Sequence, residues 1–155
     1  MNRSQLTMLL IVLSALIGVP QPALSHSGVA QYPWNPAHLE NLPAEIQADV
    51  RKWGPACGGS LAAAQQFALY LTVPGARFVA LHYDDFRCPN KVAHCDQAGC
   101  LHEVYVSTAG RYQRVLSVRA YDIRLSTFHN QAVLELMDAK GGSRMLRWNG
   151  SRFVK

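Results

Sequence analysis

Three of the four cysteines lie in a single stretch of the chain, Arg87-Cys88-Pro89-Asn90-Lys91-Val92-Ala93-His94-Cys95-Asp96-Gln97-Ala98-Gly99-Cys100-Leu101-His102-Glu103. This stretch joins two apolar, aromatic-rich runs, 78–86 and 101–107, which have the composition of β-strands. The fourth cysteine, Cys57, lies upstream in a Pro-Ala-Cys-Gly-Gly segment. We therefore expect a β-hairpin whose connecting loop is held by covalent bonds, with the rest of the domain built around it.

The four cysteines are expected to form two disulfides, and they can pair in three ways. A bridge across the hairpin favours Cys88 with Cys100, because the two Cα atoms must lie roughly 4.4–6.8 Å apart, and it leaves Cys57 to pair with Cys95. The arrangement Cys88–Cys95 with Cys57–Cys100 is nearly as good. Each bridge should stabilise the domain by roughly 2–4 kcal/mol.

The N-terminus has the pattern of a secretory signal peptide, predicted over residues 1–25. A basic tip precedes an apolar run at 6–19, and Ala23 and Ser25 place small residues before the cleavage site, so that the mature chain would begin at His26. The apolar run is shorter than the roughly 20 residues that span a bilayer. We expect a periplasmic or secreted protein with no stable membrane anchor after cleavage.

The remainder is expected to hold an extended N-terminal arm over 26–41 and a single domain over 42–155. One helix is predicted over 42–53, since Ile46, Val50 and Trp53 recur at spacings that place them on one face. The following Gly-Pro pair would end this helix.

Turn residues then recur at intervals of roughly 8–12 residues, which is typical of short antiparallel strands. A His129-Asn130 turn separates two of these strands, and Asn149-Gly150 is typical of a type I′ hairpin turn. The expected strands are 66–73, 77–86, 101–107, 111–119, 122–128, 132–137, 144–148 and 151–154. The predicted fold class is α+β, with one N-terminal helix packed on a mostly antiparallel, disulfide-stabilised β-meander.

Charge and motifs exclude several classes of function. The net charge is +5, but the basic residues are scattered, whereas a nucleic-acid surface needs a cluster or stripe. The chain has no nucleophile elbow, P-loop or dinucleotide-binding glycine pattern. Two disulfides would also leave no thiol for nucleophilic catalysis. We therefore expect a protein without enzymatic activity and without a cofactor.

The leading hypothesis is a binding protein that recognises another protein or a component of the bacterial envelope. The residues expected to form the recognition patch are Tyr83, Phe86, Arg87, Lys91 and Tyr105, which lie in or beside the cysteine loop. Aromatic residues and arginine are the types most enriched at binding hot spots.

The first alternative is a periplasmic metal-binding protein that uses His82, Asp84, His94 and His102. His94-Cys95 and Cys100-x-His102 have spacings of the order found in zinc sites, but thiols closed in disulfides cannot bind a metal. The cysteine-free set is His82, Asp84 and His102, because His82 and Asp84 would share one face of a strand and His102 would lie across the hairpin. Imidazole and carboxylate ligands suit zinc or copper.

A weaker alternative is a carbohydrate-active enzyme. Asp84, Asp85 and Glu103 are predicted near one end of the hairpin. A pair of carboxylates at such a place could act as the acid and base of a glycosidase.

Five segments together resemble a group of small exported proteins of unknown function from alphaproteobacteria, including rhizobia. They are Leu42-Pro43-Ala44-Glu45-Ile46, Cys57-Gly58-Gly59, Leu81-His82-Tyr83-Asp84-Asp85-Phe86-Arg87-Cys88, Ala98-Gly99-Cys100-Leu101-His102-Glu103-Val104-Tyr105 and Leu146-Arg147-Trp148-Asn149-Gly150-Ser151-Arg152-Phe153-Val154. The resemblance implies a periplasmic location and a disulfide-bearing β fold. Some members have degenerate calcium loops before the cysteine hairpin, but this chain has Pro74-Gly75-Ala76 there, so calcium binding is not implied. The group supplies no catalytic residues.

Overall fold

The computed structural model describes residues 34–58, 60–90 and 93–155. Mostly antiparallel sheets, three short helices and two disulfides make up this part of the chain, in agreement with the predicted α+β class. The expected signal peptide and the first part of the expected arm lie outside the described residues.

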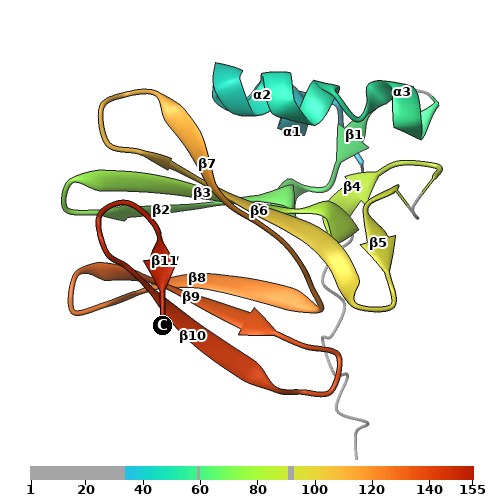
Figure 1. Cartoon of the computed structure of the whole chain (residues 1–155). Coiled ribbons are helices and arrows are strands. Elements are labelled where there is room, and N and C mark those ends of the chain that lie inside the picture. The colour runs from blue at the N-terminus through green and yellow to red at the C-terminus, as the bar shows by residue number, and fades with distance from the viewer. Residues whose placement is uncertain (1–33, 59, 91–92) are drawn as a thin grey trace, which may run out of the picture. The chain divides into compact units, whose positions relative to one another are not determined.

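The helices cluster near the start of the described chain (Figure 1). They are α1 (Ala37–Glu40), α2 (Ala44–Arg51) and α3 (Gly54–Cys57). The predicted helix is therefore present but ends two residues early. Its apolar face is as predicted, since Ile46 and Val50, one turn apart, are both buried.

The predicted extended arm is wrong in its described part, because α1 occupies residues 37–40. Pro36 has the backbone φ that suits the start of a helix, and the Asn35 side chain accepts a hydrogen bond from the Ala37 N–H at 2.9 Å. The Asn35 backbone also pairs with Ala63, which ties this segment to the domain.

A five-stranded antiparallel sheet forms the centre of the domain. Its strands are β2 (Ala68–Val73), β3 (Ala76–His82), β5 (Cys95–Asp96), β6 (Gly99–Ser107) and β7 (Tyr112–Ala120), with β6 paired to β3, β5 and β7. The hairpins predicted between 66–73 and 77–86, and across the cysteine loop, are both confirmed. The strand predicted over 77–86 ends earlier, at His82, where the 3-10 turn Tyr83–Asp85 leads to β4 (Phe86–Arg87), which pairs with β1 (Ala62–Ala63).

The remaining strands form a four-stranded meander: β8 (Asp122–Phe128), β9 (Gln131–Met137), β10 (Ser143–Trp148) and β11 (Phe153–Val154). The predicted turn at His129-Asn130 is confirmed, and both residues have positive φ. The hairpin at Asn149-Gly150 is also confirmed, but its turn is not type I′, because only Gly150 of the pair has positive φ. Instead the Asn149 side chain accepts hydrogen bonds from two backbone N–H groups of a longer loop.

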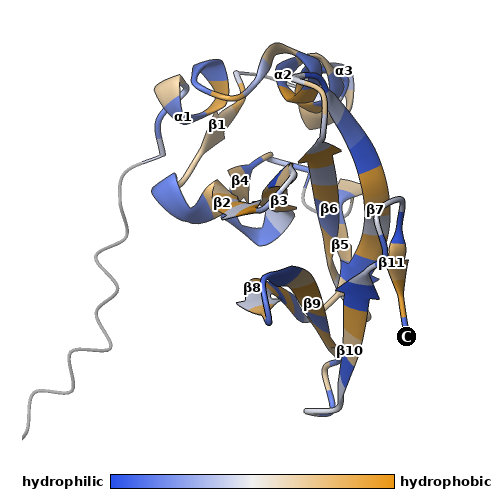
Figure 2. Ribbon diagram, turned by 90° about the vertical axis from the view of Figure 1, so that its left-hand side faces the viewer, coloured by the Kyte–Doolittle hydropathy of each residue, from blue (hydrophilic) through white to orange (hydrophobic). Residues whose placement is uncertain are grey.

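Alternation along the central strands sends successive side chains to two different cores. Figure 2 shows the helices on one side of β3 and the strands β8 and β9 on the other. Val79, Leu81 and Tyr105 pack against the helices. Residues one position away, among them Phe78 and Val104, pack against the four-stranded sheet. The domain therefore has three layers, with the five-stranded sheet in the middle.

The disulfides join Cys57 to Cys88 and Cys95 to Cys100. Both pairings favoured from the sequence are therefore wrong. Cys95 and Cys100 are direct partners in the register of β5 and β6. Cys88 does not face Cys100, because β3 ends at His82 and the chain turns back through β4 toward the end of α3.

Two intramolecular disulfides indicate a protein that folds outside the reducing cytoplasm. In the part of the chain that the structure describes, no helix is long and apolar enough to cross a membrane.

Candidate metal centre

His82 and His102 are direct partners on adjacent strands, at the end of β3 and near the start of β6. Both occupy the positions whose side chains point toward the four-stranded sheet rather than toward the helices. Their rings meet edge to face with centroids 5.1 Å apart. The hairpin register predicted from the sequence therefore brings these two imidazoles together as expected.

Both rings are removed from water, since His82 is 7% exposed and His102 is fully buried. By geometry, Nε2 of His82 and both ring nitrogens of His102 lack a hydrogen-bond partner among the described residues. The Ala120 backbone nevertheless lies close enough to the His102 ring to raise its pKa, against the effect of burial. Buried polar atoms are rarely left in this state, because each one costs free energy that water would otherwise have offset. Such atoms beside one another call for a ligand.

Asp84 supplies a carboxylate to the same place. It lies in the 3-10 turn that follows β3, not on the strand as predicted, yet one ligand atom each from His82, Asp84 and His102 lie within 4.8 Å of one another. Tetrahedral zinc with ligands near 2.1 Å separates them by about 3.4 Å. Small side-chain rotations would close that gap, and the exposed Asp84 is free to make most of the movement.

Asp122 approaches the cluster from the first residue of β8. Its Oδ1 lies 3.6 Å from Nδ1 of His82, and the same oxygen accepts a hydrogen bond from the Ile123 N–H. Sequence reasoning did not find Asp122, because nothing in the order of residues shows that the start of this strand lies beside the end of β3.

Burial lowers the pKa of His102 and so favours its uncharged imidazole. The neighbouring His82 acts on this pKa in the same direction, while Asp84 and Asp122 act in the opposite direction. Burial, followed by Asp84, raises the pKa of Asp85. A neutral histidine is the form that binds a metal ion.

His94, the fourth residue of the predicted metal set, lies elsewhere. It is buried among Trp53, Tyr83 and Phe86, with ring centroids 5.7–6.2 Å away, on the helix side of the central sheet. The metal-binding prediction is therefore corrected to the cysteine-free subset of three residues.

The predicted recognition patch is not a surface. Tyr83, Phe86 and Tyr105 are each at most 1% exposed and belong to the helix-side core. Their aromatic character reflects packing, since Tyr83 and Phe86 meet edge to face. Arg87 is exposed, and Lys91 lies outside the described residues.

Glu103 does not form a dyad with Asp84 or Asp85. It lies one residue from His102, so its side chain points to the opposite, helix-facing side of the sheet. There Oε2 accepts hydrogen bonds from the Tyr83 and Tyr105 hydroxyls, both at 3.0 Å, and Oε1 accepts one from Arg114. These contacts make Glu103 a structural carboxylate and remove it from the predicted acid–base pair.

The fold and the site together define a class: a disulfide-bonded α+β protein, rich in antiparallel sheet, with a half-open histidine and aspartate cluster. Comparison with known proteins adds no relative to this description, since no protein family model, no curated protein and no solved structure matches the chain. The function must therefore be argued from the site itself.

Proposed function

We propose that this protein is exported by an N-terminal signal peptide to the bacterial periplasm or beyond, where it binds one divalent transition-metal ion without catalysing a reaction. His82, His102 and Asp84 would be the ligands. The observation that carries the proposal is the pair of buried imidazoles with unpartnered nitrogens beside a carboxylate. The two disulfides and the resemblance to exported alphaproteobacterial proteins support the compartment.

The donor set determines which ions fit. Two imidazoles and one carboxylate suit Zn²⁺ or Cu²⁺, whereas Mg²⁺ and Ca²⁺ require sites built mainly from oxygen ligands. Both histidines are buried and Asp84 is exposed. A bound ion would therefore be shielded from water on the side of the histidines and open to water beside Asp84. Three protein ligands would leave room for water or for exchange of the ion.

The test is calorimetric titration of the metal-free, disulfide-bonded protein with Zn²⁺ and with Cu²⁺. We expect one ion per chain. His102→Gln should weaken binding at least 100-fold, and Asp84→Asn should weaken it about 10-fold, as expected for loss of a ligand or of its charge. Mg²⁺ should not compete.

His129→Gln is the matched control, because His129 is exposed in the β8–β9 turn, away from the cluster. Asp84→Asn separates loss of binding from loss of folding. Its side chain is on the surface, so the substitution should leave the unfolding midpoint unchanged. Absence of binding by the wild-type protein, or equal binding by folded His102→Gln and wild type, would refute the proposal.

A further inference from the structure

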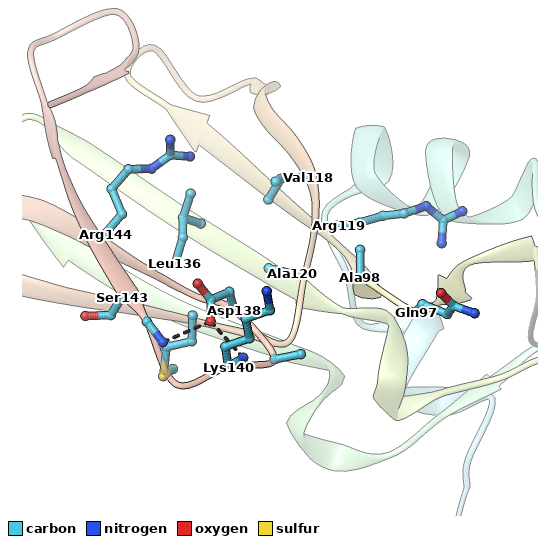
Figure 3. A pocket seen from close by; sticks show the side chains of 13 residues that line it. Gln97, Ala98, Val118, Arg119, Ala120, Leu136, Asp138, Lys140, Ser143 and Arg144 are labelled. Carbon is cyan, nitrogen blue, oxygen red and sulfur yellow. Dashed lines mark hydrogen bonds between the residues drawn. The ribbon is translucent and has the colours of Figure 1, made fainter.

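A groove lies between β7, the β5–β6 turn and the β9–β10 turn, and Figure 3 shows the side chains that line it. Its volume is about 660 Å³, within the range of roughly 300–1,000 Å³ that is usual for small-molecule sites. None of the three proposed metal ligands lines it. The groove is thus a separate feature of the molecule.

The floor of the groove is apolar. Val118, Ala120 and Leu136 supply it, and the latter two are only 7% exposed. In Figure 3 these side chains lie between the long side chains of Arg144 on one side and Arg119 on the other. An apolar surface of this kind favours a ligand that has an apolar body.

The basic residues of the groove differ in whether they have a partner of opposite charge. Arg119 is held by Asp96 at 3.4 Å and by the Ala93 carbonyl. Lys140 and Arg144, both exposed, form no ion pair with any residue in the described ranges.

Asp138 is the acid of the groove, and it is engaged locally. Its Oδ1 accepts hydrogen bonds from the backbone N–H groups of Lys140 at 2.8 Å and Gly142 at 2.9 Å, which shapes the β9–β10 turn. This carboxylate is thus oriented by the turn and forms no ion pair with either neighbouring cation. The groove retains positive charge next to its apolar floor.

We propose that this groove binds a small organic anion, with an apolar body over Val118 and Leu136 and a single carboxylate, sulfonate or phosphate group attracted by the positive charges of Lys140 and Arg144. A neutral apolar compound would leave the two cations without a counter-charge. An inorganic anion would leave the floor exposed to water. Only a ligand with both parts is complementary to the whole groove.

The probe is 8-anilinonaphthalene-1-sulfonate, which combines an aromatic body with one sulfonate and fluoresces strongly when it leaves water. Titration into metal-free folded protein should give a saturable, blue-shifted signal with one site per chain. The double variant Lys140→Gln/Arg144→Gln should weaken binding at least tenfold. Octanoate should displace the probe, whereas octanol at equal concentration should not.

Arg152→Gln is the matched control, because it removes an exposed arginine from the β10–β11 loop, outside the groove. In methyl NMR spectra, the probe should shift the signals of Val118 and Leu136. The proposal fails if the probe does not bind, if the folded double variant binds as the wild type does, or if octanol displaces the probe as well as octanoate. None of these outcomes depends on whether the protein binds a metal.

Discussion

Asp122 is the residue expected to set which nitrogen of His82 faces a metal ion. A carboxylate beside one ring nitrogen favours the proton there and leaves the other nitrogen with a free lone pair. Asp122 lies 3.6 Å from Nδ1, and the buried, unpartnered nitrogen is Nε2. The two atoms are slightly beyond hydrogen-bond distance, and a small approach would form the carboxylate–histidine pair that supports metal sites in many proteins.

Asp122→Asn should therefore weaken Zn²⁺ binding about 10–100-fold without removing a ligand. The measurement is a competition titration against a chromogenic chelator at neutral pH. Asp96→Asn is the control, since Asp96 lies near the same surface but pairs with Arg119. Equal affinities for the two variants would contradict the positioning role.

Tyr105 carries a second residue-scale prediction, on pH and stability. Burial, followed by Glu103, raises the pKa of Tyr105 well above its usual value near 10. Asp49, whose carboxylate accepts a hydrogen bond from the Tyr105 hydroxyl at 3.1 Å, acts in the same direction. The folded protein therefore keeps this proton when the unfolded chain loses it.

The stability from Tyr105 is fully present below about pH 10 and is lost as pH rises above that value, because only the unfolded state then releases the proton. Urea unfolding at a series of alkaline pH values should show a steep fall in the free energy of unfolding. Tyr105→Phe should make that fall shallower, while Tyr121→Phe, at a position 67% exposed, should not. A Tyr105→Phe curve parallel to the wild type would count against this assignment.

At the scale of elements, Glu103 connects the central sheet to the helix layer. Its carboxylate accepts from two tyrosine hydroxyls on the buried side, and one of these, Tyr83, also accepts a hydrogen bond from the Trp53 indole at 3.2 Å. A buried donor that loses its acceptor costs about 1–3 kcal/mol. The network therefore fixes how the helices lie on the sheet.

Glu103→Leu should lower the free energy of unfolding by about 2 kcal/mol, because the Tyr83 hydroxyl loses its acceptor while the Tyr105 hydroxyl retains Asp49. Glu103→Gln should cost about 1 kcal/mol, since its carbonyl oxygen can still accept from both, and the half-exposed Arg114 can turn to water. Urea denaturation followed by tryptophan fluorescence measures both. Glu135→Gln, which removes a more exposed pair with Arg124, should cost less than about 1 kcal/mol. Similar costs for the Leu and Gln variants would show that the hydroxyls find other acceptors.

The two disulfides close loops of very different length, with sequence separations of 31 and 5 residues. The chain-entropy relation gives about 3.7 kcal/mol for the longer loop and about 2 kcal/mol for the shorter. Replacing Cys57 and Cys88 by alanine should therefore destabilise the protein more than replacing Cys95 and Cys100. Thermal unfolding of the two double variants tests the order, and the reverse order would show that native-state packing outweighs loop closure.

Element boundaries were largely predictable, and the reason is local. The strand at 122–128 was predicted with its observed bounds, and the paired histidines followed from the register of one hairpin. The disulfide pairing was not predictable, because it depends on β3 ending at His82, and the aromatic sequence 83–86 continues a strand-like pattern through a turn. Asp122 was missed for the same reason, since its place depends on how two sheets meet.

At the scale of the molecule, the sequence predicted one meander, whereas the described strands divide into two main sheets that pack through a shared core. In the sequence, a strand buried on both faces differs from a strand buried on one face only in having a more continuous run of apolar residues. β3 and β6 are buried on both faces, and their nearly continuous burial reflects this central position. The layered arrangement also places His82 and His102, and the apolar residues Val118 and Ala120 of the groove, on the side of the central sheet away from the helices.

The last prediction concerns the whole chain in its compartment. Protein isolated from the periplasm and denatured should have the mass of a chain that begins at His26. That mass should be four hydrogens below the mass of the reduced chain, because both disulfides form only in an oxidising environment. Alkylation after denaturation should add nothing. Native mass spectrometry after incubation with Zn²⁺ should show one further ion, absent from His102→Gln.

Each part of this measurement can fail separately. A mass that retains residues 1–25 would refute cleavage, and alkylation at two or four cysteines would refute the disulfide framework and return the thiols as possible ligands. If the wild-type protein shows no zinc adduct but the other two results are as expected, only metal binding is refuted, and the exported domain with its two disulfides stands. Because cleavage, alkylation and the zinc adduct are measured separately, the three results together determine which of export, disulfide formation and metal binding this molecule has.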